Sequence, residues 1–338
     1  MTTLRILLKG LLISLLFTIE PTFAQFYYAD NGNGTCTIQG YYGTNSTVNI
    51  PGSTNGLIVT SIQDNAFLNN TIVTSVTIPN SVTSIGNTVF WGCTSLTNVT
   101  IPNSVTYLGA ETFIYCYNLI SVTIPSSVTN DLTAPFEGCT SLSTIPLDPA
   151  NPFYTVVDGV LFDKNQTTLV EFPGGKGGSY TIPSIVTNFG DYAFASCQLT
   201  NVTIPNSVIS VGNWAFYESA LTYAFFQGNE PAETFDNAFY YTESAVYYLP
   251  GTTGWGSSFG AVPTTLWNPQ ATSLSTAGGL LGFNITGTAG IPIVVEACTN
   301  LGSTWLPLQT CTVTNGSIYF SDPQWTNYPS RFYRISSP

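Results

Sequence analysis

The sequence predicts a mainly β protein, in which a solenoid of about six to seven 23-residue units is followed by a small β-sandwich. Val-Thr-Ile-Pro begins at Val76, Val99, Val122 and Val202, and the first three copies are 23 residues apart. A fixed period of this length is typical of stacked identical units. Only 7% of the residues are charged, so the polar surface must consist of Thr, Ser, Asn and Gly, which favour strands and turns.

Residues 1–24 have the features of a secretory signal peptide. Arg5 and Lys9 supply a positive start, Leu11 to Ile19 form an apolar stretch, and small residues stand at the two cleavage positions that end in Ala24. The stretch is shorter than the roughly 20 apolar residues that span a bilayer. We therefore expect cleavage after Ala24, and a secreted or cell-surface protein with no membrane-spanning segment after the signal.

The remaining chain is strongly acidic. Arg5, Lys9 and Glu20 are lost with the signal, which leaves 4 basic and 17 acidic residues and a net charge of about −13. Nucleic-acid binding needs a basic patch, so the composition argues against a nucleic-acid partner.

Residues 25–58 are expected to cap the N-terminal edge of the solenoid. Phe26 to Gly43 alternates polar and apolar residues around Asp30-Asn31-Gly32-Asn33-Gly34, a pattern that predicts a hairpin. A cap is required because an open sheet edge exposes unpaired backbone groups.

The repeats span residues 59–265, and their phenylalanines define the register. Leu96-x-x-Val99-x-Ile101 predicts a strand that turns Val99 and Ile101 into the core and Asn98 and Thr100 onto an open face. Stacking should place the equivalent phenylalanines in one buried column. These residues are Phe67, Phe90, Phe113, Phe136, Phe194, Phe216 and Phe239.

The unit Ile-Gly…Ala-Phe…Cys-x-x-Leu…Val-x-Ile-Pro resembles the BspA-type leucine-rich repeat, also called the Treponema pallidum type. The resemblance covers roughly Phe26 to Pro263. It implies a secreted or surface-displayed protein, since some members of the family bind extracellular matrix or other host proteins. It implies no catalytic residues and no cofactor.

Two segments interrupt or close the repeats. Residues 147–179 form an insertion, in which Val156 to Phe162 and Thr168 to Phe172 are expected to be the two strands of a hairpin that projects from the stack. Residues 245–263 resemble the segment that closes the solenoid in the same family.

Residues 266–338 lose the period and are expected to form the β-sandwich. Their ending resembles a C-terminal module of exported bacterial proteins, for which a sorting or anchoring role is one hypothesis. Gly and Pro turns separate five predicted strands, Leu280 to Thr286, Ile291 to Ala297, Leu306 to Val313, Ser317 to Ser321 and Phe332 to Ile335.

The sequence contains no histidine, which excludes Ser-His-Asp and Cys-His catalysis. The repeat cysteines are expected to form a buried ladder, within which one bridge between neighbours stays possible, and no close Cys pair suggests a metal site. Cys298 and Cys311 lie on neighbouring predicted strands, so a disulfide between them is possible. The repeat-position cysteines are Cys93, Cys116, Cys139 and Cys197.

Glu230, Glu233 and Asp236 gather in the last repeat. Paired carboxylates serve glycosidases, so a carbohydrate-active enzyme is an alternative function. The simpler interpretation is an exposed acidic loop, because nothing in the sequence fixes the separation of the carboxylates.

The open, concave sheet is the main candidate binding site. Repeat proteins commonly bind through such surfaces, so we expect non-catalytic recognition of an extracellular protein or polysaccharide. A structural coat protein without a specific ligand is the other alternative. The candidate residues are Ser75, Thr77, Asn98, Thr100, Ser121, Thr123, Asn201 and Thr203.

Overall fold

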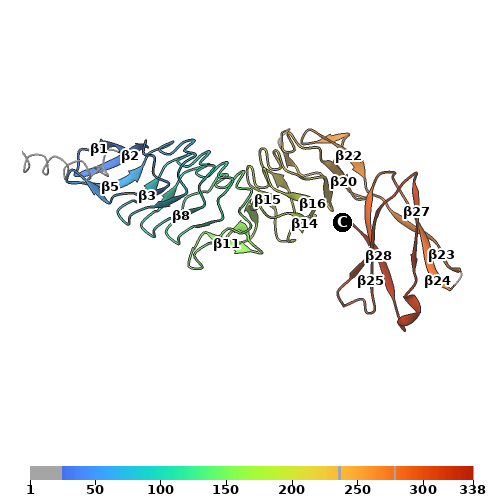
Figure 1. Ribbon diagram of the computed structural model, residues 1–338. Coiled ribbons are helices and arrows are strands. Elements are labelled where there is room, and N and C mark those ends of the chain that lie inside the picture. The colour runs from blue at the N-terminus through green and yellow to red at the C-terminus, as the bar shows by residue number, and fades with distance from the viewer. Residues whose placement is uncertain (1–24, 235–236, 278, 338) are drawn as a thin grey trace, which may run out of the picture.

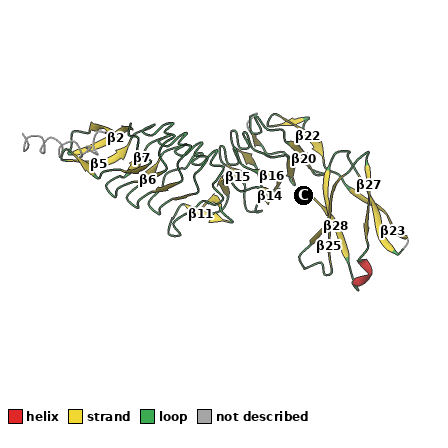
Figure 2. Cartoon of the chain, in the orientation of Figure 1, coloured by secondary structure: helices red, strands yellow, loops and turns green. Residues whose placement is uncertain are grey.

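The computed structural model describes residues 25–337 except 235–236 and 278, so the predicted signal peptide lies outside the described residues. An elongated solenoid is followed by a separate β lobe at its C-terminal end (Figure 1). Strands and loops make up almost all of the described chain, and one short 3₁₀ turn, η2 (Trp325–Asn327), lies in the final lobe (Figure 2). The expected solenoid followed by a sandwich is confirmed.

An antiparallel hairpin covers the N-terminal edge. Strand β1 (Phe26–Asp30) pairs with β2 (Thr35–Tyr41), and β2 then pairs in parallel with β5 (Leu57–Ile62), the first strand of the stack. The carboxylate of Asp30 accepts a hydrogen bond of 2.8 Å from the Gly32 amide and closes the turn. The hairpin thereby pairs an edge that would otherwise be open.

The first half of the solenoid, here called the N-terminal block, ends at Leu147 and carries two parallel sheets. The open-face sheet consists of β3 (Thr47–Asn49), β6 (Ser75–Thr77), β8 (Asn98–Thr100) and β10 (Ser121–Thr123). The second-face sheet continues from β2 and β5, beside which β4 (Ser53–Thr54) lies, to β7 (Ser84–Ile85) and β9 (Tyr107–Leu108).

The second half, here called the C-terminal block, runs from Thr168 to Leu266 and repeats this arrangement. Its open-face sheet contains β14 (Gly178–Thr181), β16 (Leu199–Ile204), β18 (Tyr223–Phe226), β20 (Ala245–Tyr248), β22 (Val262–Leu266) and β21 (Ser258–Phe259). Its second-face sheet contains β13 (Thr168–Glu171), β15 (Asn188–Phe189), β17 (Ser210–Val211) and β19 (Glu233–Thr234).

The phenylalanines stack in two columns, one in each block. In the N-terminal block Phe90 and Phe113 lie 5.3 Å apart at 6°, and in the C-terminal block Phe194 and Phe216 lie 4.8 Å apart at 9°. Phe172 stands 5.3 Å from Phe194 and is fully buried, so it begins the second column. Phe172 stands 22 residues before Phe194, the same spacing as Phe194 to Phe216, so it fits the period although it lies inside the predicted insertion.

The insertion lies between the two blocks. The expected antiparallel pairing of its two apolar segments is present, between Val160–Asp163 and Thr168–Glu171, but the hairpin is packed into the stack and does not project from it. The segment forms three strands, β11 (Tyr154–Val157), β12 (Val160–Asp163) and β13, joined into the second-face sheet. Asp158 and Gly159, with φ of 50° and 82°, make the turn between β11 and β12. Leu161 packs into the core of the N-terminal block and Phe162 into that of the C-terminal block. The β11–β12 hairpin is therefore an internal wedge, because both of its sides are apolar.

The repeat cysteines form the expected buried ladder. The thiols of Cys93, Cys116 and Cys139 each donate to the carbonyl of the phenylalanine one turn earlier, at 3.1, 3.1 and 3.2 Å. Burial raises the pKa of Cys93 and of Cys197 to about 12. A small residue with a weak donor suits this position, and all seven cysteines are free thiols.

The final lobe is a sandwich of two three-stranded antiparallel sheets. One has the order β23 (Gln270–Ala277), β24 (Leu280–Thr286), β27 (Ser317–Asp322), and the other β26 (Leu306–Thr312), β25 (Pro292–Cys298), β28 (Phe332–Ser336). The sheets enclose one core, in which Phe283 of β24 and Tyr333 of β28 meet edge to face at 6.0 Å. Strand β23 was not expected, since Leu274 is its only large apolar residue.

The possible Cys298–Cys311 disulfide is wrong. The two cysteines do lie on paired strands, but the register places Cys311 opposite Ile293 and Cys298 opposite Phe332. Five residues along a strand separate Ile293 from Cys298, which is about 17 Å. A disulfide needs Cα atoms within about 7 Å.

Candidate functional site

The open face of the N-terminal block carries two rows of polar side chains. Parallel pairing aligns Ser75, Asn98 and Ser121 in one row and Thr77, Thr100 and Thr123 in the other. The valines between them, Val76, Val99 and Val122, are buried in the core. Because the period of a strand is two, burying the valines turns Ser75, Asn98 and the three threonines outward.

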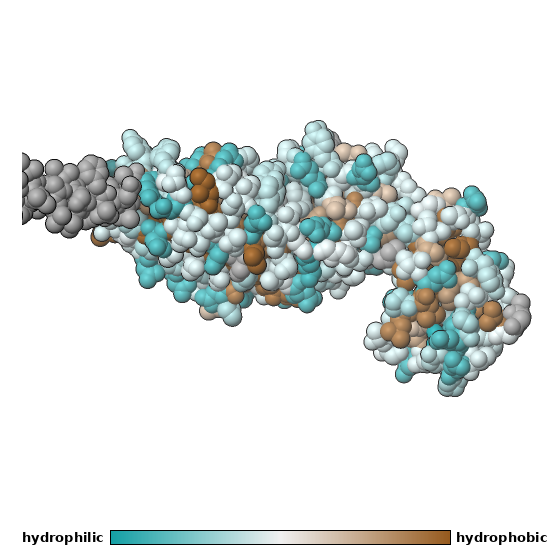
Figure 3. All heavy atoms as spheres, viewed as in Figure 1, coloured by the Kyte–Doolittle hydropathy of each residue, from teal (hydrophilic) through white to brown (hydrophobic). Residues whose placement is uncertain are grey.

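These rows are open to solvent. Thr77, Asn98, Thr100 and Thr123 are exposed and Ser75 is half-buried, whereas the side chain of Ser121 lies outside the described side chains. Neighbouring strands are about 4.8 Å apart, so each row repeats its polar groups at that interval. The visible surface of the solenoid is mainly hydrophilic or intermediate in hydropathy, with scattered apolar residues (Figure 3).

Asn201 and Thr203 belong to a different sheet, so the eight candidate residues do not form one continuous row. Thr203 aligns with Thr181, Phe225 and Tyr247 across β14, β18 and β20. Thr203 is only 8% exposed, and its hydroxyl lies 3.1 Å from that of Ser337. Asn201 is half-buried and donates to Ser179 at 3.1 Å. The C-terminal lobe thus covers part of this face.

Aromatic residues explain why the sandwich docks here. Phe225 and Tyr247 stand where the earlier repeats have threonine, and they stack at 5.4 Å and 16°. They share a core with Ile291 and Ile293 of the sandwich. Trp267 joins the contact and donates to the Pro292 carbonyl at 2.9 Å. The signal was present in the sequence as aromatic residues at outward positions of the last repeats, and it was overlooked.

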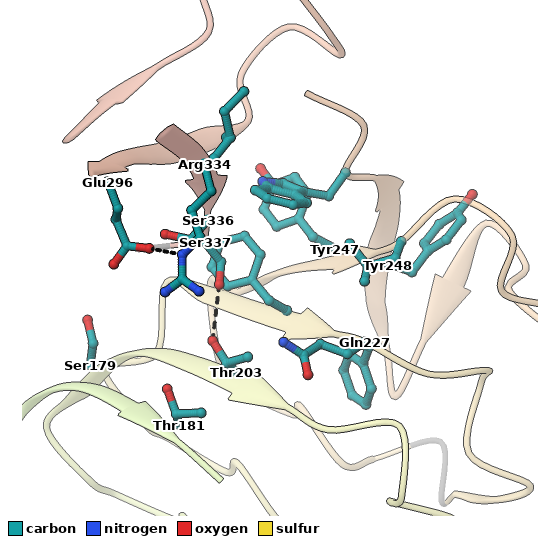
Figure 4. Close-up of a pocket in the computed structure, with 15 residues that line it drawn as sticks. Ser179, Thr181, Thr203, Gln227, Tyr247, Tyr248, Glu296, Arg334, Ser336 and Ser337 are labelled. Atoms are coloured by element: carbon teal, nitrogen blue, oxygen red, sulfur yellow. Dashed lines mark hydrogen bonds and ion pairs between the residues drawn. The ribbon is translucent and has the colours of Figure 1, made fainter. Parts of the chain in front are cut away.

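A cleft of about 430 Å³ lies between the open face of the C-terminal block and the sandwich (Figure 4). The solenoid contributes Thr181, Thr203 and Gln227. From the other side the Arg334 guanidinium of β28 points into the cleft, and its Nε lies 2.6 Å from Glu296 (Figure 4). The cleft was not predicted, because it exists only where two distant segments meet.

The acidic residues of the last repeat do not form a defined pair. Glu230 is half-buried in the loop before β19, and the backbone of Glu233 pairs with Ser210 on the second-face sheet. The side chain of Glu233 is not described, and Asp236 lies outside the described residues. The structure therefore adds no geometry in favour of a glycosidase at this place.

Two other carboxyls are buried where the blocks meet, and sequence reasoning missed both. Glu137 is 3% exposed, and burial together with Glu111 and Glu218 raises its pKa to about 7. Glu171 is 1% exposed, and burial raises its pKa well above the ordinary value, with a smaller contribution from Glu137. One oxygen of Glu171, Oε2, has no hydrogen-bond partner in the described structure.

The BspA type leucine rich repeat region matches residues 60–176 and 171–253 in six copies. The chain belongs to the BspA-type leucine-rich repeat family. This assignment agrees with the 23-residue unit and with the parallel stacks observed. No curated protein matches the chain. Within the described residues, no helix is long and apolar enough to cross a membrane.

Solved structures of other bacterial leucine-rich repeat proteins are similar to this BspA-type chain. A leucine rich cell surface protein of Faecalibacterium prausnitzii is 23% identical, with 68% of this chain and 88% of that one covered and a TM-score of 0.35. A leucine-rich repeat protein of Eubacterium ventriosum is 21% identical, with coverages of 67% and 77% and a TM-score of 0.45. A leucine-rich repeat protein of Bacteroides capillosus is 32% identical over 37% of this chain and 94% of its own, with a TM-score of 0.34.

Proposed function

We propose that this protein is an exported, non-catalytic binding protein that recognises an extracellular protein or polysaccharide through the open face of its N-terminal block. The observation that carries the proposal is the alignment of exposed polar side chains, Thr77, Thr100 and Thr123, on three adjacent parallel strands. A rigid row of donors and acceptors is well suited to an extended partner that presents polar groups at regular intervals.

Composition and family support the same proposal. The chain is acidic, which disfavours nucleic acid, and it has no histidine for acid–base catalysis. Proteins of the BspA type are typically secreted or displayed at the cell surface. We place this chain there too, with residues 1–24 as the export signal, and mass spectrometry of exported protein that begins at Gln25 would support this placement.

The test compares the chain from residue 25 with two triple variants on glycan and extracellular-protein arrays. The first changes Thr77, Thr100 and Thr123 to Lys on the open face. The matched control changes Thr83, Thr106 and Thr129 to Lys, three exposed threonines with the same 23-residue spacing that lie on or beside the second face. Loss of at least about 10-fold in binding is expected only for the first variant, because bulky charges displace hydrogen bonds that are each worth about 3- to 10-fold.

Equal binding by the natural chain and the open-face variant would show that the open face is not the binding site. Equal loss in both variants would indicate an effect of charge alone. Both variants should keep the far-UV circular dichroism spectrum of the natural chain, since all six threonines are exposed.

A further inference from the structure

The cleft between the C-terminal block and the sandwich is a second surface with its own chemistry. Its volume of about 430 Å³ falls within the range of ligand pockets, roughly 300 to 1,000 Å³. It is lined by the open-face sheet of the C-terminal block, and no residue of the rows on β6, β8 and β10 lines it. A ligand bound here is therefore independent of a partner bound at those rows.

The polar groups of the cleft can both donate and accept hydrogen bonds. Ser179 and Thr181 present exposed hydroxyls from β14, and Gln227 presents an exposed amide after β18. Ser336 and Ser337 add hydroxyls from the sandwich. A hydroxyl or an amide pairs equally with donors and acceptors, so this wall matches a ligand that is rich in hydroxyls.

The cleft is electrically neutral. Glu296 and Arg334 are the charged residues among those that line it, and they form an ion pair of 2.6 Å. The guanidinium also stacks over Trp305 at 4.6 Å, so its planar edge is held in one orientation. Because the charges cancel in a strongly acidic molecule, an anionic ligand gains little here.

Aromatic rings form most of the apolar lining. Tyr248 is half-buried and held by stacking on Trp255 at 5.3 Å and 9°. Trp267 is fixed by its bond to Pro292. Rings that are already immobilised lose little conformational entropy when a flat apolar surface packs against them. One such surface is the C–H face of a sugar ring.

We propose that this cleft binds a short segment of a neutral polysaccharide. A sugar combines hydroxyls that donate and accept with an apolar ring face, and the cleft offers the complement of both. A peptide bound by strand addition needs an unpaired strand edge. Most of the solenoid wall is the face of a sheet, because β16, β18 and β20 are each paired on both sides. Strands β14 and β28 are edge strands, so a peptide is the competing ligand in the test.

The test is calorimetric titration of the chain from residue 25 with neutral hexasaccharides derived from cellulose, laminarin, xylan and mannan. Hexagalacturonate serves as the acidic probe and a decapeptide library as the peptide probe. The cleft variant combines Thr181→Val with Gln227→Leu, at two exposed positions where folding is not at stake. The matched control, Thr106→Val with Gln63→Leu, makes the same changes at exposed positions away from both the cleft and the open-face rows.

At least one neutral hexasaccharide is expected to bind, and the cleft variant should weaken it by about 10-fold, since each lost hydrogen bond is worth about 3- to 10-fold. The control should bind as the natural chain does. The absence of binding by every neutral probe would overturn the proposal, as would binding that the cleft variant leaves unchanged. Cleft-dependent binding of hexagalacturonate or a peptide without a neutral sugar would show that the ligand class is wrong.

The two proposals are distinguishable in the same experiment. The lysine variant of the open face should keep hexasaccharide binding in the cleft. The cleft variant should keep array binding at the open face. Failure of one leaves the other standing.

Discussion

Glu137 and Glu171 are acidic side chains buried inside a solenoid whose core is otherwise mainly apolar. In the sequence they stand on either side of the wedge, and each is next to a phenylalanine of a stacked column, Phe136 or Phe172. Glu171 lies close enough to Cys139 and Cys197 to raise the pKa of both thiols. A carboxyl in such surroundings is most stable when it is protonated and neutral.

The burial of Glu137 makes folding stability depend on pH. Its pKa is about 7 in the folded chain, against an ordinary value of 4.5. The contribution of Glu137 to the free energy of unfolding is therefore complete below about pH 4.5. This contribution, about 2 to 3 kcal/mol, is lost as pH rises through about 7. Urea unfolding at pH 5 and pH 8 should show a smaller fall in the free energy of unfolding for Glu137→Gln than for the natural chain.

Glu243→Gln is the control for that experiment, because Glu243 is exposed. It should keep the pH dependence of the natural chain. If Glu137→Gln also kept it in full, the carboxyl would be ionised in the folded state at neutral pH.

The thiols supply a second prediction at this scale. Denatured protein should contain seven titratable thiols, because every cysteine is free. In the folded chain at pH 8 the half-buried Cys311 should react with a thiol reagent before Cys93 and Cys197, whose pKa of about 12 keeps them protonated. A count below seven under denaturing conditions would reveal a bridge that contradicts the structure.

At the scale of elements, the β11–β12 hairpin joins the two blocks. Its tip reaches Ser143 and Thr144, and the Gly159 carbonyl accepts a hydrogen bond of 3.2 Å from the Ile145 amide. The Lys176 ammonium donates to the Asp158 carbonyl at 2.7 Å. The hairpin thus holds the last turn of the N-terminal block against the first turn of the C-terminal block.

Substitutions at two glycines distinguish the effect of backbone strain from the effect of crowding at the hairpin tip. Gly56 and Gly159 both have a φ of 82°, but a Cβ at Gly56 would meet open space, whereas at Gly159 it would approach Thr144 and Ser143 to 3.2–3.3 Å. Gly56→Ala should lower the free energy of unfolding by about 1 to 2 kcal/mol through backbone strain alone. Gly159→Ala should lower it further, as measured by urea unfolding. Equal losses would mean that the tip does not press on the neighbouring turn.

At the scale of the whole molecule, the docking of the sandwich makes the open faces of the two blocks different. The N-terminal block keeps its rows of threonine and asparagine free, while the C-terminal block uses Phe225 and Tyr247 to hold the sandwich. The chain terminus lies beside β16 and β28 as a result (Figure 1). The same open face is thus exposed to solvent in the N-terminal block and covered by the sandwich in the C-terminal block.

Trp267 should control this docking. It packs edge to face on Phe225 at 6.1 Å and bonds to the sandwich through Pro292. Trp267→Ala is expected to loosen the lobe, so that small-angle scattering shows a larger radius of gyration and proteases cut faster between residues 266 and 280. Trp91→Ala, on the N-terminal block, is the control and should change neither. An unchanged radius for Trp267→Ala would show that the other apolar contacts suffice.

The sequence was informative where a period existed and poor where it failed. The recurrence of Phe90 and Val99 predicted the stack, because identical neighbours leave little choice of packing. The turn at Asp158 was missed, since inside the insertion no repeat partner gives the register. Phe172 was missed although its 22-residue spacing to Phe194 equals that of Phe194 to Phe216. The open-face rows were predicted from the same period, but the covering of Thr203 was not. Docking depends on residues far apart in sequence. The outward aromatic residues Phe225 and Tyr247 signal a covered face, but nothing local identifies Ile293 as their partner.

The wedge also determines how cooperatively the solenoid folds and unfolds. In a solenoid each turn contacts only its neighbours, so cooperativity extends as far as the core is continuous. Here the apolar interior is divided into two clusters that meet at the hairpin. Each cluster can unfold as its own unit while the other persists. The solenoid is thus two short cooperative segments in series, and heat or denaturant is expected to unfold it in steps rather than all at once.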